Sequence, residues 1–63
     1  MPAEPIFVDT QEAARRLGLS LSTLEKYRFY RAADAPPYVR IGRAVRYRVS
    51  DLEAWAAARE AEQ

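Results

Sequence analysis

Apolar positions along the chain change their spacing twice, which predicts two helices, a β-hairpin and a third helix. Residues 6–8 form a short apolar entry to the first helix. Asp9 or Thr10 can cap that helix, and Asp9 and Glu12 have the spacing of a capping box. Its expected apolar stripe is Ala13, Ala14 and Leu17. We expect the helix to end at Gly18, because glycine readily takes the left-handed conformation that closes a helix.

The second helix follows after a short turn. Ser20 and Ser22 are alternative N-caps: Ser20 leaves the shorter turn, and Ser22 has capping-box spacing with Glu25. Leu24 and Tyr27 recur at helical spacing and are expected to face the core. The outer face then carries Ser22, Thr23 and Lys26. Two short helices joined by a glycine-containing turn are typical of the helix-turn-helix motif, whose second helix reads the major groove of DNA.

A basic hairpin is predicted after the second helix. Residues 32–37 break the helix because two of them are consecutive prolines. Apolar and basic residues then alternate over 38–41 and 45–48, on either side of a hairpin-length loop at 42–44. The expected apolar face is Val39, Ile41, Val45 and Tyr47. The tip and the opposite face are expected to present Arg40, Arg43, Arg46 and Arg48.

The third helix is expected to begin at a capping box formed by Ser50 and Glu53 and to run to about Arg59. Its inward stripe is Leu52, Trp55 and Ala56. We interpret Trp55 as a packing residue, because a lone tryptophan at helical spacing from a leucine is usually part of a core.

Composition limits how large the core can be. The chain has 63 residues, of which 49% are hydrophobic, but 12 of those are alanine. A single thin core in one small domain is therefore expected. Phe29 and Tyr30 are expected to complete that core behind the two prolines, and a contact between protomers is the alternative for them.

The residue types also exclude most chemistry. The sequence has neither cysteine nor histidine, which removes disulfides, thiolate metal sites and the commonest general base. The carboxylates are better explained as groups at helix starts and in the tail. We therefore expect no enzyme, with no catalytic residue, no metal site and no cofactor. No apolar run is long enough for a membrane span, and the N-terminus does not resemble a signal peptide. The expected protein is soluble and cytoplasmic, with no membrane partner.

Charge is distributed unevenly along the chain, although the net charge is only +1. Residues 15–48 hold nine Lys and Arg against two acidic residues, while residues 1–14 and 49–63 each have a net charge of −3. All but one of the nine cations are arginine, which suits bidentate contacts to phosphate or guanine. A basic middle with acidic ends favours a domain that meets a polyanion with one face, rather than a generic solvated surface.

Duplex DNA is the polyanion that this arrangement fits best. With the second helix in the major groove, Ser22, Thr23 and Lys26 are expected near base edges, and Arg28 and Arg31 near phosphates. The arginines of the hairpin would reach the neighbouring backbone or the minor groove. One such module buries about 600–1,000 Å² on DNA, so several copies on adjacent sites, or a partner protein, are expected.

From residue 23 to Trp55 the sequence resembles the excisionase family of small winged-helix proteins, which is related to AlpA-type and MerR-type DNA-binding domains. The resemblance rests on the runs TLEKYR, PPYVRIGRAVRYR and SDLEAW and covers roughly residues 6–59. It implies an α+β, mainly helical, winged helix-turn-helix in which the hairpin is the wing. Residues 1–5 would be a flexible arm and residues 60–63 a fraying tail.

The resemblance also implies roles for single residues. Positions matching Ser22, Thr23 and Lys26 supply groove contacts, and wing positions matching Arg40, Arg43 and Arg46 approach the backbone or the minor groove. The sequence departs from the family at residues 32–35, where a glycine is common after the second helix, and at Tyr27, where tryptophan is common.

These features lead to an expected function. Family members without a further domain are commonly recombination directionality factors, which bind repeated sites, bend DNA and turn an integrase toward excision. The expected partners are double-stranded DNA, other copies of the chain and an integrase, on the nucleoid of a bacterial host. A small winged-helix transcriptional regulator is the first alternative, and a protein-interaction module is the second.

Overall fold

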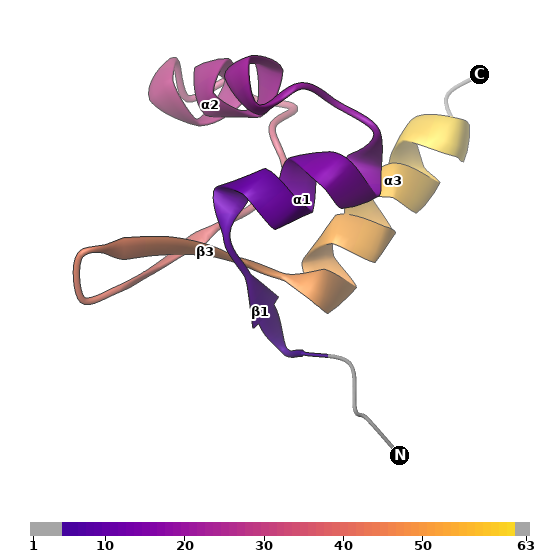
Figure 1. The fold of residues 1–63 in the computed structure, drawn as a ribbon. Helices are drawn as coiled ribbons and strands as arrows, with labels where there is room; N and C mark the ends of the chain where they lie inside the picture. Colours follow the sequence, from indigo (N-terminus) through magenta and orange to yellow (C-terminus); the bar gives the residue numbers. More distant parts are fainter. Residues whose placement is uncertain (1–4, 62–63) are drawn as a thin grey trace.

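The computed structural model describes residues 5–61. Its elements are, in chain order, β1 (Phe7–Val8), α1 (Thr10–Leu17), α2 (Leu21–Phe29), β2 (Val39–Ile41), β3 (Ala44–Arg48) and α3 (Val49–Ala61). Figure 1 shows α1 in the centre with α2 above it, while the β2–β3 hairpin and α3 extend to opposite sides. Three helices and a three-stranded antiparallel sheet confirm the predicted winged helix-turn-helix. Within the described range, every helix falls short of the length and hydrophobicity that a membrane crossing requires.

The ends of the chain are covered only in part. Residues 1–4 of the predicted arm and residues 62–63 of the predicted tail lie outside the described residues. Glu60 and Ala61, which belong to the predicted tail, form the last positions of α3.

Local signals set both ends of α1. The Asp9 carboxylate accepts a hydrogen bond from the Glu12 amide at 2.8 Å, so Asp9 is the N-cap. Gly18 has φ of +72°, and its amide donates to the Arg15 carbonyl at 3.2 Å. The Leu19 amide donates to the Ala14 carbonyl at 2.9 Å, which completes a Schellman motif. The predicted stop at Gly18 is confirmed.

Glu12 also forms ion pairs, because its carboxylate lies between two arginines of the same helix. The Arg15 Nε donates to it at 2.8 Å and the Arg16 Nε at 3.0 Å. Hydrogen bonding by Arg15, assisted by Arg16, lowers the pKa of Glu12 from 4.5 to about 2, although desolvation opposes this shift. Two of the nine clustered cations are therefore paired on α1.

Ser20 caps α2, which settles the choice that the sequence left open. Its hydroxyl oxygen accepts from the Thr23 amide at 3.0 Å, and its O–H donates to the Thr23 hydroxyl at 2.8 Å. The helix buries Leu24 completely and Tyr27 in part, as predicted. It ends at Phe29, with Tyr30 as its C-cap.

Arg31 holds the position that glycine usually takes after a helix. Its φ is +52°, and it is the only non-glycine residue with positive φ among residues 5–61. The Ala32 amide donates to the Tyr27 carbonyl at 3.1 Å, and the Arg31 amide donates to the Arg28 carbonyl at 3.2 Å. This is a second Schellman motif. Arg31 is therefore the position at which a glycine would fit. It lies one residue before residues 32–35, where the sequence lacks the glycine that is common in the excisionase family.

The sheet contains a strand that the sequence pattern did not predict as one. β1 pairs with β3 antiparallel, with Val8 opposite Tyr47, so the strand order is β1-β3-β2. The Val49 amide donates to the Ile6 carbonyl at 2.9 Å just beyond that pairing. The short apolar segment before α1 is thus an edge strand of the sheet, and it pairs with β3 on the side opposite β2.

The register of the hairpin differs from the expected one. Ile41 pairs with Ala44, so the loop has two residues, Gly42 and Arg43, rather than three. Gly42 has φ of +64° while Arg43 does not have positive φ, the pattern of a type II′ turn. A shift of one residue exchanges the faces of a strand. The predicted apolar face of four residues on the hairpin is therefore wrong: Val39 pairs with Arg46, and Arg40 pairs with Val45.

α3 begins directly after β3, at Val49, so the predicted capping box at Ser50 is wrong. Ser50 lies inside the first helical turn, and its side chain makes no hydrogen bond with residues 5–61. Because the amide of Val49 is already bonded to the chain before β1, the helix start is held by the sheet rather than by a serine cap.

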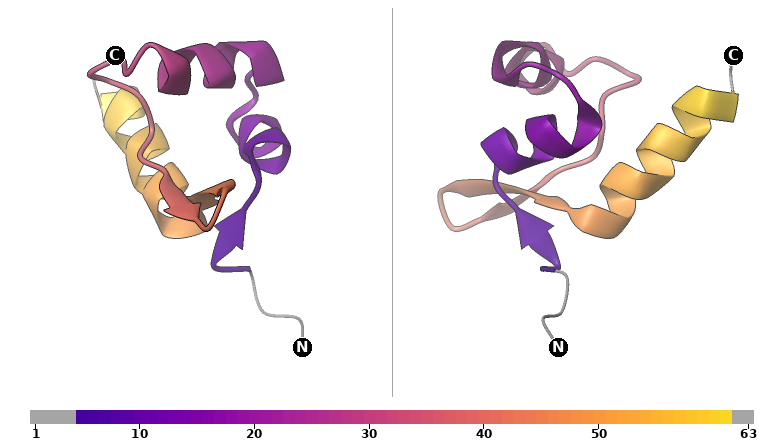
Figure 2. Two further views of the ribbon diagram at one scale, coloured as in Figure 1. Left: turned by 90° about the vertical axis from the view of Figure 1, so that its left-hand side faces the viewer. Right: turned by 45° about the vertical axis from the view of Figure 1, so that its right-hand side comes forward.

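The core is small and lies where α1, α2, α3 and the sheet meet (Figure 2). Its largest fully buried side chains are Tyr47 and Leu24. The remaining buried hydrophobic residues are Val8, Ala13, Ala14, Val49 and Leu52. Two alanines let α1 approach its neighbours closely, which is how so few large side chains fill the interior.

Trp55 packs at the edge of this core and anchors the segment after α2. Its indole N–H donates to the Asp34 carbonyl at 2.7 Å, and its ring meets Tyr27 edge to face at 6.2 Å. The Arg59 guanidinium lies over the same ring at 5.2 Å. Trp55 therefore packs against neighbouring side chains, as interpreted, but it is half-buried and lies outside the core cluster.

Replacing Arg31 with glycine should raise the free energy of unfolding by about 1 kcal/mol. A left-handed conformation disfavours residues with a Cβ by about 1–2 kcal/mol, and the greater freedom of glycine in the unfolded chain offsets part of that gain. Chemical denaturation measures the difference. Arg31→Ala is the matched control, since it removes the charge and keeps the Cβ. A glycine variant no more stable than the alanine variant would contradict the assignment.

Replacing Glu12 with glutamine should lower stability in a pH-dependent way. The pKa of Glu12 is lower in the folded protein, so its stabilisation is fully present above 4.5 and disappears as pH falls toward about 2. Thermal melts should give the wild type a higher melting temperature than Glu12→Gln near neutral pH. The two melting temperatures should converge as the pH falls from 4.5 to about 2. Glu60→Gln, on the far end of α3, should show no such convergence. A constant gap between wild type and Glu12→Gln would exclude the ionised pair as its source.

Candidate nucleic-acid interface

The outer face of α2 carries three exposed polar residues, which we call the recognition face: Ser22, Thr23 and Lys26. They point outward because Leu24 fixes the opposite side of the helix in the core. The Thr23 hydroxyl accepts the bond from Ser20, which leaves its own O–H free to donate. The structure therefore brings the three predicted groove residues together.

Two shallow grooves border this face and meet at Lys26. The first, of about 310 Å³, is lined by Ser22, Glu25, Lys26, Arg28, Phe29 and Tyr30. The second, of about 250 Å³, is lined by Thr23, Lys26, Tyr27, Tyr30 and Ala32. Glu25 is an addition that the sequence interpretation missed, although its position three residues after Ser22 could have indicated it.

Arg28 is partly buried and holds the helices and the sheet together. Its Nη1 donates to the Thr10 hydroxyl at 3.1 Å, which ties α2 to the start of α1. It also interacts with the Tyr47 hydroxyl: burial raises the pKa of Tyr47, and hydrogen bonding and charge from Arg28 offset part of that shift. The guanidinium of Arg28 is therefore engaged by Thr10 and Tyr47, although the residue also lines the first groove beside the recognition face.

Arg31 is exposed at the end of α2, beyond the recognition face. Its side chain makes no hydrogen bond or ion pair with the residues that the structure describes, and the same holds for Lys26. These two cations, unlike Arg15 and Arg16, are not neutralised by a neighbouring carboxylate.

The four arginines of the hairpin do not share one face. Arg40 lies on the side of Val45, which packs against the core, and Arg43 lies in the turn. Arg46 and Arg48 point to the opposite side of the sheet, because alternate residues of a strand face opposite ways. Arg40 and Arg43 are exposed and have no side-chain partner within residues 5–61.

The two remaining hairpin arginines have partners in the fold. The Arg46 Nη1 donates to the Val45 carbonyl at 2.8 Å. The Arg48 guanidinium lies 5.1 Å from the centre of the Phe7 ring, and its Nε is 4.0 Å from the Asp51 carboxylate. Both side chains are therefore less available than Arg40 and Arg43.

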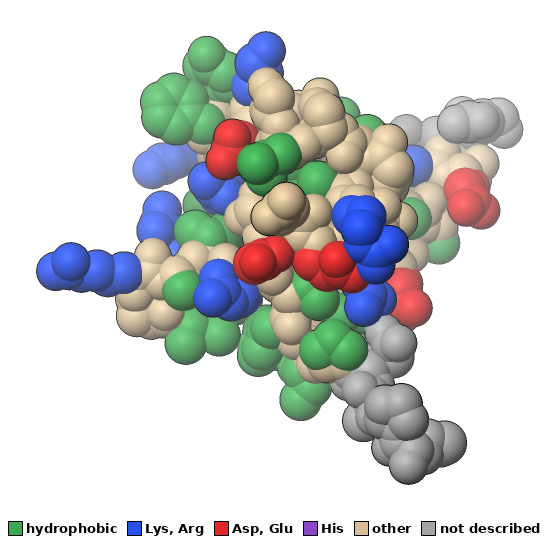
Figure 3. All heavy atoms as spheres, viewed as in Figure 1, with side chains coloured by type: hydrophobic (Ala, Val, Ile, Leu, Met, Phe, Trp, Pro, Cys, Tyr) green, Lys and Arg blue, Asp and Glu red, His purple; other side chains and the backbone are tan. Residues whose placement is uncertain are grey.

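Figure 3 shows how the charges are distributed on one side of the molecule. Blue side chains gather toward the end of α2 and the projecting hairpin, while a second blue group lies against red ones over α1. The unpaired cations thus occupy a smaller area than the basic stretch of sequence indicated. They are Lys26, Arg31, Arg40 and Arg43 among residues 5–61.

Phe29 and Tyr30 are 77% and 72% exposed, so the expectation that they complete the core is wrong. Their rings meet edge to face, with centroids 5.2 Å apart. The reason lies in the helix end: Leu24 and Tyr27 already face the core, and the left-handed turn at Arg31 then carries the chain back toward Trp55. The last residues of α2 consequently project outward.

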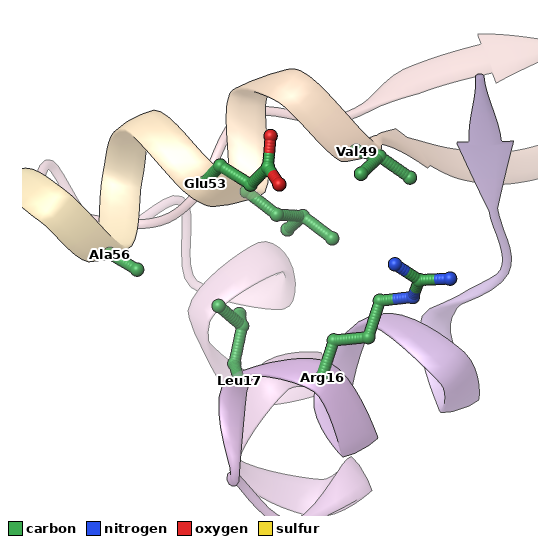
Figure 4. Close-up of a pocket in the computed structure, with 6 residues that line it drawn as sticks. Arg16, Leu17, Val49, Glu53 and Ala56 are labelled. Atoms are coloured by element: carbon green, nitrogen blue, oxygen red, sulfur yellow. The ribbon is translucent and has the colours of Figure 1, made fainter. Parts of the chain in front are cut away.

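Another groove, of about 290 Å³, lies between α1 and α3. Its walls are largely apolar, and Figure 4 shows Arg16 and Glu53 extending from the two helices beside Leu17, Val49 and Ala56. None of the predicted DNA-contact residues lines it. It is a crevice of the helix packing and separate from the recognition face.

Comparison with known proteins agrees with this geometry. A family model described as a helix-turn-helix domain matches residues 7–60. No curated protein matches the sequence. The family match spans all three helices except the final residue of α3, and all three strands. The chain therefore belongs to the helix-turn-helix domain family, which implies DNA as its partner.

Proposed function

We propose that this chain is an excisionase-type architectural protein: it binds repeated sites in attachment-site DNA, bends the duplex and directs an integrase toward excision. The observation that carries the proposal is the placement, on both α2 and the hairpin, of cations that form no ion pair within residues 5–61, although Glu25 lines the groove beside Lys26. The helix-turn-helix family also includes excisionase-like proteins.

In this proposal α2 enters the major groove. Helices of this motif contact base edges with their N-terminal residues, and in α2 those are Ser22 and Thr23. The free O–H of Thr23 can donate to a base acceptor, and Lys26 can donate to guanine O6 or N7. Arg31, at the end of the helix, would contact the phosphate backbone.

The hairpin would contact the adjacent backbone or minor groove. Arg43 in the turn and Arg40 on the side of the core are the best candidates, because nothing in residues 5–61 holds either side chain. Arg46 and Arg48 would first have to leave the Val45 carbonyl, or Phe7 and Asp51. Arg28 acts as a positioning residue, since it fixes α2 against α1 and the sheet.

The dimensions favour binding by several copies. The described part measures 35 × 28 × 17 Å, which limits how much DNA one copy can cover. A single module with about 600–1,000 Å² of contact binds modestly, so repeated sites would supply the remaining affinity.

Replacing Arg43 or Arg40 with alanine should weaken duplex binding on every sequence and flatten its salt dependence. Each lost phosphate contact should reduce the slope of log K against log salt by about 0.9. Fluorescence anisotropy over a salt series measures this slope. Arg15→Ala is the matched control, because Arg15 is paired with Glu12 on α1. Thr23→Ala should instead change the preferred sequence. An unchanged slope in both hairpin variants would exclude the hairpin from the interface.

Tandem sites should bind cooperatively and become bent. On duplexes carrying one, two or three copies of a selected site, gel shifts should show ladders whose later steps form more readily than the first. A circular-permutation assay should show a bend that grows with copy number, and an excision assay with the cognate integrase should depend on it. Independent binding to straight DNA, together with altered transcription in the absence of an integrase, would identify the transcriptional regulator instead.

A further inference from the structure

Phe29 and Tyr30 are the most exposed large hydrophobic residues in the described part of the chain. They rest on each other and not on the core, with ring centroids 5.2 Å apart. A paired aromatic surface of this kind on a small soluble domain usually marks a contact site. The fold itself does not require either ring in this position.

Both rings extend the recognition face along α2. Phe29 follows Ser22 by seven residues, and Tyr30 follows Thr23 by seven, so each pair lies on one side of the helix. The grooves beside Lys26 agree: one is lined by Ser22 and Phe29, and the other by Thr23 and Tyr30. A duplex that contacts Ser22, Thr23 and Lys26 would meet both rings.

The charge around the rings favours DNA over a second copy of the chain. Lys26, Arg28 and the acidic Glu25 line the groove with both rings, and Arg31 directly follows Tyr30 in the chain, so the surroundings of the rings carry a net positive charge. A symmetric contact between two copies through this patch would bring together two surfaces of net positive charge, because the single carboxylate of Glu25 in this groove does not balance Lys26, Arg28 and Arg31. Phosphates would neutralise them.

Within the major groove, thymine presents a methyl group at C5 as the apolar feature of its base edge, and aromatic side chains such as Phe contact it. We propose that Phe29 and Tyr30 recognise thymine through this methyl group and so determine sequence preference at one end of the site. The inference rests on the proposed DNA-binding function. It assigns apolar readout to one end of α2 and polar readout to the other.

The test removes the methyl group alone. A binding site is first selected with the wild-type chain from a pool of random duplexes, and each thymine in it is then replaced by deoxyuridine. Losing one contacted methyl should weaken binding about fourfold, as expected for about 0.8 kcal/mol per buried carbon. Phe29→Ala and Tyr30→Ala should bind the thymine duplex more weakly and should not distinguish it from the deoxyuridine duplex at the affected positions.

Ile6→Ala is the matched control, since Ile6 is 64% exposed but lies before β1, away from α2. It should retain the full difference between thymine and deoxyuridine. Tyr30→Phe should retain it as well, because the ring and not the hydroxyl makes the contact. Circular dichroism on each variant verifies that the helices are intact.

The possible failures are distinguishable. If the wild type binds the selected duplex and no deoxyuridine substitution matters, the methyl readout is wrong and the DNA-binding function stands. If Phe29→Ala abolishes association of the free chain in sedimentation but leaves the thymine preference intact, the pair is a contact between copies and the inference is overturned. If the wild type selects no duplex at all, the proposed function itself fails.

Discussion

The fold depends on the burial of Tyr47 in the central strand. Tyr47 is 1% exposed, lies in β3 between β1 and β2, and interacts through its hydroxyl with Arg28 of α2. In a domain with so few large core residues, this one side chain fixes which face of the sheet points inward. The directions of Arg46 and Arg48 follow from that choice, because they lie on the same strand and alternate with Tyr47.

Local signals predicted most of the helices correctly, because each acts within four residues. Asp9 and Ser20 cap their helices with hydrogen bonds to nearby amides, and Gly18 ends α1 by its own conformation. The hairpin register was beyond such reasoning. Alternating residues are compatible with a loop of two or three residues, and the choice between them depends on how β2 and β3 pair, with Ile41 opposite Ala44.

The sequence predicted where the candidate interface lies, but the residues that form it in the structure differ from the predicted set. Ser22, Thr23 and Lys26 share a face because helical spacing determines it. Counting cations along the chain overstated the basic surface, since pairing is a property of positions in space: Glu12 neutralises part of it, and Arg28 turns inward. Phe29 and Tyr30 were misplaced for the same reason, because hydrophobicity alone does not say which side of a helix end the core lies on.

Arg31 shows that one position can serve two requirements that conflict. Its backbone conformation is one that glycine adopts with least strain, while its side chain is an unpaired cation at the end of α2. A glycine there would favour the folded state and remove a charge that a polyanion attracts. The residue present therefore represents a compromise in which some conformational stability is given up for surface charge.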